Sequence, residues 1–139
     1  MSRKLSVQLQ FILRIVLATF YLAAGFLHLS APGGFLRIMP PMIPFPDAVV
    51  AFTGLCEIAG ALGLLIPQTR RWAGRMLALY ALCVWPANLY HALWRVHVAS
   101  LPDSWWYHGP RLAFQPVLIW SALFVSDTLR WPVWKPRKH

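Results

Sequence analysis

Acidic residues are scarce in this sequence. Only 4 of its 139 residues are aspartate or glutamate, against 13 lysines and arginines, and charged residues amount to 12% in all. A soluble domain carries about 25% charged residues, so water is not the main solvent of this chain. The net charge of +9 would suit nucleic acid, but a basic surface over a soluble core does not need long uncharged apolar runs. We therefore expect the lipid bilayer, and no nucleic acid, as the partner.

Cysteine is also rare, and sequence motifs for electron carriers are absent. Cys56 and Cys83 lie in apolar segments and form no C-x-x-C pair, which argues against a disulfide scaffold and a thioredoxin-like site. The chain has no haem-attachment motif and no Rossmann fingerprint. His28 and His91 fall on different predicted helices without chelating spacing, so we expect no metal site. A redox role would therefore need a membrane or soluble partner protein.

Four apolar segments are long enough to cross a bilayer. A hydrocarbon core of about 30 Å needs roughly 20 helical residues. We expect helices at about residues 9–29, 48–66, 72–94 and 112–129. Several prolines and a Gly-Gly pair exclude a continuous helix in the loop 30–47, although residues 35–39 favour a short interfacial turn. The prediction is one all-α domain over residues 1–139, a bundle of four transmembrane helices.

Lysine and arginine indicate the orientation of this bundle. One side carries Arg3, Lys4, Arg70, Arg71, Arg75, Arg130, Lys135, Arg137 and Lys138. The other side is flanked only by Arg37, Arg95 and Arg111. Cytoplasmic flanks retain an excess of these residues. We therefore expect both termini in the cytoplasm, the loop 30–47 on the non-cytoplasmic side, and a multi-pass protein of the inner (plasma) membrane.

Polar residues inside the apolar segments are the candidates for function, because they are costly in a membrane. Arg14, Tyr21 and His28 recur every seven residues and share one helical face. That face points inward, or else Arg14 snorkels to the interface and His28 merely ends the helix. Glu57 lies roughly 15 Å deep in its helix, so we expect it to be protonated or paired. A structural hydrogen bond between helices is the alternative reading of Glu57.

The third and fourth predicted helices add a second polar group. Asn88, His91 and Arg95 form a polar edge, and Arg111 and Gln115 stand four residues apart at the start of the fourth helix. We expect one ligand-binding cavity, lined by His28, Glu57, Asn88, His91, Arg111 and Gln115. Arg14, Tyr21 and Arg95 are assigned structural roles, and no catalytic residue is assigned. These groups suit a carbonyl-bearing head group such as a quinone, and they suit a lipid equally.

Several short motifs resemble the DoxX family of membrane proteins. They are GFLH at 25–28, FLRIMPPMIP at 35–44, GLCEIAG at 54–60, LLIP at 64–67 with TRR at 69–71, WPANLYH at 85–91, and RLAFQ at 111–115. The resemblance implies a four-helix membrane bundle. Its relatives include a subunit of a thiosulfate:quinone oxidoreductase, partners of redox enzymes, and a eukaryotic chaperone for nicotinic receptors. Relatives usually carry proline where this chain has Ala113.

Two function classes follow from these patterns. The first is a DoxX-like inner-membrane accessory subunit of a membrane redox system, which binds a quinone or a lipid; its cofactor stays open, with a quinone as the candidate. The second is a non-enzymatic assembly factor or chaperone whose polar residues grip the helices of a partner membrane protein. A transporter is a third reading, for which a homodimer would have to supply the missing half.

Overall fold

The computed structural model describes residues 3–98 and 101–129, and every regular element within them is an α-helix. The helices are α1 (Arg3–Ser30), α2 (Gly33–Arg37), α3 (Pro46–Leu65), α4 (Arg70–Leu93) and α5 (Trp105–Val125). α2 is little more than one turn, whereas the other four contain 28, 20, 24 and 21 residues. The predicted all-α class is confirmed for the described residues.

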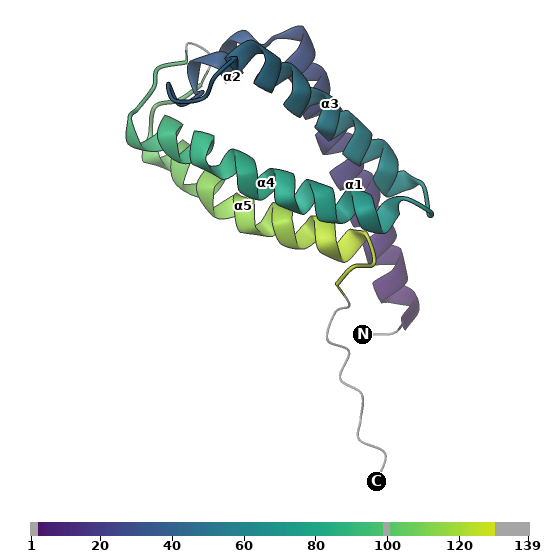
Figure 1. The fold of residues 1–139 in the computed structure, drawn as a ribbon. Helices are drawn as coiled ribbons and strands as arrows, with labels where there is room; N and C mark the ends of the chain where they lie inside the picture. The colour runs from purple at the N-terminus through teal and green to yellow at the C-terminus, as the bar shows by residue number, and fades with distance from the viewer. Residues whose placement is uncertain (1–2, 99–100, 130–139) are drawn as a thin grey trace.

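The four long helices form two pairs. α1 packs along α3, α4 packs along α5, and a short connection joins α3 to α4. Figure 1 shows α3 and α4 close together at this connection and far apart toward α2. The start of α1 and the end of α5 lie near the same connection. We call this the basic end, because Arg70, Arg71 and Arg75 belong to it, and the opposite one the α2 end.

The hydrophobic core lies where the helices converge, nearer the basic end. Leu64 of α3 and Leu77 of α4 are almost fully buried there, together with small residues of the neighbouring helices. Gly74 lets α4 and α5 touch: a Cβ atom at this position would overlap the side chain of Ser126 and lie 2.6 Å from the carbonyl oxygen of Ala122. Packing is therefore tight at one end of the bundle and opens toward the other.

Asp127 ties α1, α4 and α5 together at the basic end. Its carboxylate accepts a hydrogen bond of 2.9 Å from the Gln10 amide and lies 3.4 Å from a guanidinium nitrogen of both Arg14 and Arg70. Arg14 also donates to the Val125 carbonyl over 2.7 Å and is itself buried. Arg14 thus points from α1 toward the end of α5. This agrees with the interpretation in which the face of α1 that carries Arg14 points inward.

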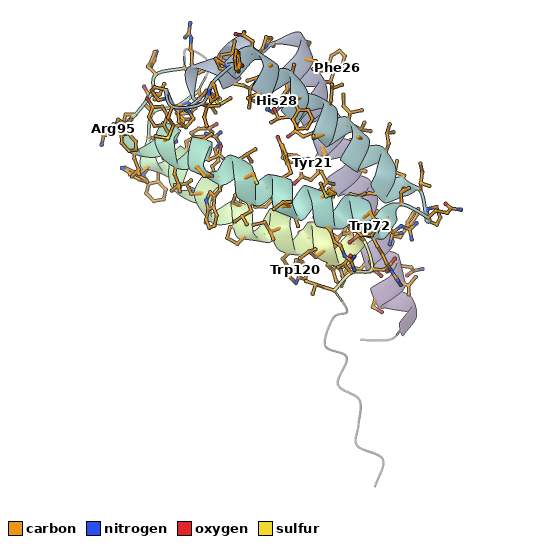
Figure 2. All side chains as sticks on the ribbon, in the orientation of Figure 1. Tyr21, Phe26, His28, Trp72, Arg95 and Trp120 are labelled. Atoms are coloured by element: carbon orange, nitrogen blue, oxygen red, sulfur yellow. The ribbon has the colours of Figure 1, made fainter. Side chains whose placement is uncertain are left out.

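Three helices are long and apolar enough to cross a membrane, and they indicate a multi-pass membrane protein. The segments are Ser6–Ser30, Pro46–Leu65 and Arg70–Leu93. Large apolar side chains also point outward, among them Phe26 and Trp72, each 67% exposed and labelled in Figure 2. Such a surface suits lipid rather than water. α5 falls outside this group because polar residues, including Arg111 and Gln115, occupy its first half.

The predicted bounds of the fourth helix, 112–129, are wrong. α5 begins at Trp105, so residues 105–111, which precede the predicted helix, form its first turns. The backbone N–H groups of Tyr107 and His108 bond to the Ser104 carbonyl and start the helix. The helix ends at Val125 with Ser126 as its C-cap, and Asp127 then adopts a left-handed φ of 62°. The predicted bounds follow the apolar run, which marks only the part of a helix that faces lipid. The helical backbone hydrogen bonds of α5 begin earlier, in polar sequence.

Candidate functional site

A cavity of about 1320 Å³ separates the two helix pairs. Its walls are overwhelmingly apolar and come from α1, α2, α3, α4 and α5. Ligand pockets usually enclose about 300–1,000 Å³, so this space exceeds what one compact head group would fill. Figure 2 shows Tyr21 in the space between α3 and α4, with His28 nearer the α2 end. The cavity is thus large enough for a polar head group with a hydrocarbon tail.

The cavity is open beside α3 and α4. Four of its lining residues on these helices have large exposed fractions: Phe52 and Leu62 of α3 are 66% and 49% exposed, and Met76 and Leu79 of α4 are 58% and 52% exposed. All four are apolar, so the rim of this opening matches the interior of a bilayer. A molecule dissolved in lipid would reach the cavity without crossing water.

The first polar group of the cavity, the carboxylate cluster, consists of His28, Glu57 and Tyr80. Glu57 is 4% exposed, its Oε2 lies 2.9 Å from Nδ1 of His28, and its Oε1 accepts a hydrogen bond of 2.8 Å from the Tyr80 hydroxyl. The same Nδ1 of His28 donates to the Ala24 carbonyl over 2.9 Å. Nδ1 of His28 therefore lies near two acceptors, the Ala24 carbonyl and Oε2 of Glu57. Its hydrogen bond goes to Ala24, so Oε2 is close to His28 but accepts no hydrogen bond from it.

Two glycines bring His28 to Glu57. Gly25 lies three residues before His28, and Gly54 lies three residues before Glu57. A Cβ atom on Gly25 would stand 2.6 Å from the Gly54 carbonyl oxygen, and a Cβ on Gly54 would stand 2.8 Å from Cβ of His28. The backbones of α1 and α3 therefore touch at this point, which allows two side chains one turn away to meet.

Tyr21 and α2 complete the surroundings of the carboxylate cluster. Tyr21 is 2% exposed, and its hydroxyl has no hydrogen bond within the described part of the chain. Its ring meets that of Tyr80 edge to face at 6.3 Å. Phe35 of α2 stacks on the His28 ring with centroids 3.6 Å apart. Tyr21 thus offers a free buried hydroxyl to the cavity, and α2 covers His28 from the α2 end.

The second polar group, the guanidinium cluster, consists of Asn88, His91 and Arg111. Arg111 donates from Nη2 to the Asn88 Oδ1 atom and from Nη1 to Nδ1 of His91, each over 2.6 Å. Arginine has donors only, so Nδ1 of His91 accepts this bond, and its ring is neutral with the proton on Nε2. Gln115, one turn further along α5, donates to the Ala81 carbonyl over 2.8 Å. These contacts fix the guanidinium against α4.

Most of the predicted site residues do meet at one cavity. Its lining includes His28, Glu57, Asn88, Arg111 and Gln115, and also Tyr21, for which we had expected a structural role only. His91 is fully buried behind Arg111 and does not line the cavity. Arg14 lies at the basic end, and Arg95 is exposed after α4 (Figure 2). In the described residues no group of three or more potential ligands could hold a metal ion.

Sequence reasoning missed Tyr80 and His108. His108 is 2% exposed, its ring lies 4.7 Å from that of His91, and neither of its ring nitrogens has a hydrogen bond to a described residue. The predicted fourth helix begins at residue 112, so His108 falls outside it. With the observed start, His108, Arg111 and Gln115 are three and four residues apart and share one face of α5. Tyr80 carried a weaker signal, a hydroxyl in the middle of an otherwise apolar span.

Comparison with known proteins gives one match. A family model described as a domain of unknown function (DUF8561) matches residues 17–126. The matched segment contains both polar clusters, the second half of α1 and the whole of α2, α3, α4 and α5. No curated protein and no solved structure matches the chain. The matching family is not the DoxX family, so that resemblance stays a prediction from the motifs.

Proposed function

The chain belongs to the DUF8561 family, and we propose that it is a four-span inner-membrane protein that binds a quinone or a lipid in its interhelical cavity. In this proposal it serves as an accessory subunit of a membrane redox system. The observation that carries the proposal is the cavity itself. Its volume of about 1320 Å³, its apolar walls and its two polar clusters fit a molecule with an oxygen-bearing head and an apolar tail.

The proposal counts α5 as the fourth span. α5 has 21 residues, which at 1.5 Å each match a hydrocarbon core of about 30 Å. It packs along α4, whose own composition suits a span, and its polar residues turn inward to α4 and the cavity. With four spans, the start of α1 and the end of α5 lie on the side of the basic end, and the excess of arginine there supports a cytoplasmic location.

The polar clusters suit oxygen atoms of a head group. Arg111 and Asn88 supply N–H donors, while Tyr21 supplies a buried hydroxyl from α1. Quinone carbonyls and lipid carboxylates or phosphates are all acceptors for such donors. Glu57 with its neighbour His28 adds a site that can exchange a proton with the ligand.

The redox part of the proposal rests on the resemblance of the motifs to the DoxX family. The chain has no sequence motif for an electron carrier of its own. In a redox system it would therefore hold the quinone for a partner that supplies the electrons. If the ligand is a lipid and not a quinone, the cavity still binds a ligand, but the chain has no role in a redox system.

Identification of the molecules that copurify with the protein tests the proposal. The full chain is purified in mild detergent and analysed by native mass spectrometry and organic extraction. We expect a near-stoichiometric quinone or lipid in the wild type, lost in Glu57→Ala and retained in Asp47→Ala, a matched control because Asp47 is exposed at the start of α3. A stoichiometric membrane protein with no small molecule would instead support an assembly factor.

A further inference from the structure

Arg111 carries a positive charge that the protein does not neutralise. Its two hydrogen-bond acceptors, the Asn88 Oδ1 atom and the His91 Nδ1 atom, are both neutral. The Tyr107 ring, 5.8 Å from the guanidinium carbon, adds only a weak cation–π contact. Within the described part of the chain no ion pair reaches Arg111. The guanidinium therefore faces an apolar cavity with its charge unpaired.

No acidic side chain of the sequence is free to pair with Arg111. The chain has only 4 acidic residues. Glu57 is engaged by His28 and Tyr80. Asp127 is bound at the basic end, and Asp103 lies 2.7 Å from His97 in the loop before α5. Asp47 is exposed at the start of α3, where it does not line the cavity.

An unpaired cation beside apolar walls is costly, and charged residues that persist inside membrane proteins mark binding sites or pathways. A guanidinium has five N–H donors in a planar fork that matches a carboxylate or a phosphate. Two of the nitrogens, Nη1 and Nη2, are held by His91 and Asn88, which fixes the fork in place. The remaining donors of Arg111, which lines the cavity, are without a partner among the described residues.

We infer that the ligand is an anionic amphiphile whose carboxylate or phosphate binds Arg111. This inference rests on the proposed cavity function and specifies the charge of the ligand, which selects a lipid over the neutral quinone. The anion supplies the counter-charge that the chain lacks, and charge-assisted bonds of this kind are about twice as strong as neutral ones. The hydrocarbon chain occupies the apolar part of the cavity and extends toward the opening beside α3 and α4, which is lined by Phe52 and Met76.

Binding of matched charged and neutral probes to the wild-type protein tests this inference without any substitution. Oleate is compared with its methyl ester, and lysophosphatidic acid with monoacylglycerol, by native mass spectrometry in nonionic detergent. We expect each anion to bind about 10- to 100-fold more tightly than its neutral counterpart. The tighter of the two anions identifies carboxylate or phosphate as the head group. Equal binding of anion and neutral probe overturns the inference but keeps the cavity function, whereas no binding of any probe contradicts both.

Substitution of Arg111 locates the anion site. Arg111→Gln should lower the affinity for the preferred anion by about 10- to 100-fold and leave binding of the neutral probe unchanged. Arg111→Lys should restore part of the affinity, because the charge returns without the fork. Arg37→Gln is the matched control: it removes the same charge at the α2 end, from an exposed residue outside the cavity. Equal losses in Arg111→Gln and Arg37→Gln would show a non-specific surface effect and refute the site, and circular dichroism verifies that each variant is folded.

Discussion

Gly54→Ala should destabilise the protein by forcing α1 and α3 apart. A Cβ atom at Gly54 would stand 2.8 Å from Cβ of His28 and 3.0 Å from the Gly25 carbonyl oxygen. Carbon atoms pack at about 3.5–4.0 Å, so the helices would have to separate by roughly 0.7 Å at this point. The same shift would stretch the 2.9 Å contact between His28 Nδ1 and Glu57 Oε2 to about 3.6 Å and weaken the electrostatic attraction between them.

Gly109→Ala is the matched control for this prediction. Gly109 also lies inside a helix, and a Cβ atom there would meet nothing within 4 Å. Alanine favours a helix by about 1 kcal/mol over glycine in both variants. Overpacking costs about 1–3 kcal/mol, so Gly54→Ala should be less stable than Gly109→Ala by that amount. Thermal unfolding of both variants in the same detergent, followed by circular dichroism, measures the difference, and a melting temperature for Gly54→Ala at or above that of Gly109→Ala would refute the packing argument.

Two further substitutions probe the polar contacts. Asp127→Asn should lower the free energy of unfolding by less than about 1 kcal/mol, because the carboxylate is 42% exposed and such ion pairs are weak; a loss no larger than that of Asp47→Asn would show that Asp127 contributes nothing to joining the helices. Tyr80→Phe removes a donor from the buried carboxylate of Glu57 and should cost about 1–3 kcal/mol. Tyr90→Phe is its control, since no hydrogen bond of the Tyr90 hydroxyl is described, and equal melting temperatures for the two tyrosine variants would contradict the role of Tyr80.

The long apolar helices were predictable because their length and composition follow from the bilayer alone. The predicted segments 48–66 and 72–94 agree with α3 and α4 to within two residues at each end. The fourth helix was misplaced because its first two turns carry aromatic and polar residues that are equally typical of an interfacial loop. Nothing in the residue pattern distinguishes these readings. The difference arises from backbone hydrogen bonds and from contacts of α5 with α4.

The polar residues of the cavity could be chosen from depth and helical face, but their pairing could not. Glu57 was expected to be paired or protonated, and the structure supplies His28 and Tyr80 as neighbours. That pairing depends on how closely α1 approaches α3, which two glycines allow and no spacing rule states. The hydrogen-bond partners of Arg111 could not be predicted either, because they depend on how α5 is aligned along α4, and no sequence pattern gives that alignment.

Determination of an experimental structure in a lipid nanodisc tests the central claim most directly. We predict that the cavity persists between the helix pairs and holds an elongated molecule, with its head group within hydrogen-bonding distance of Arg111. Its tail should lead toward the opening beside α3 and α4. A bundle in which α3 and α4 pack together along their whole length, with Arg111 paired to a protein carboxylate and no space for a ligand, would contradict the account.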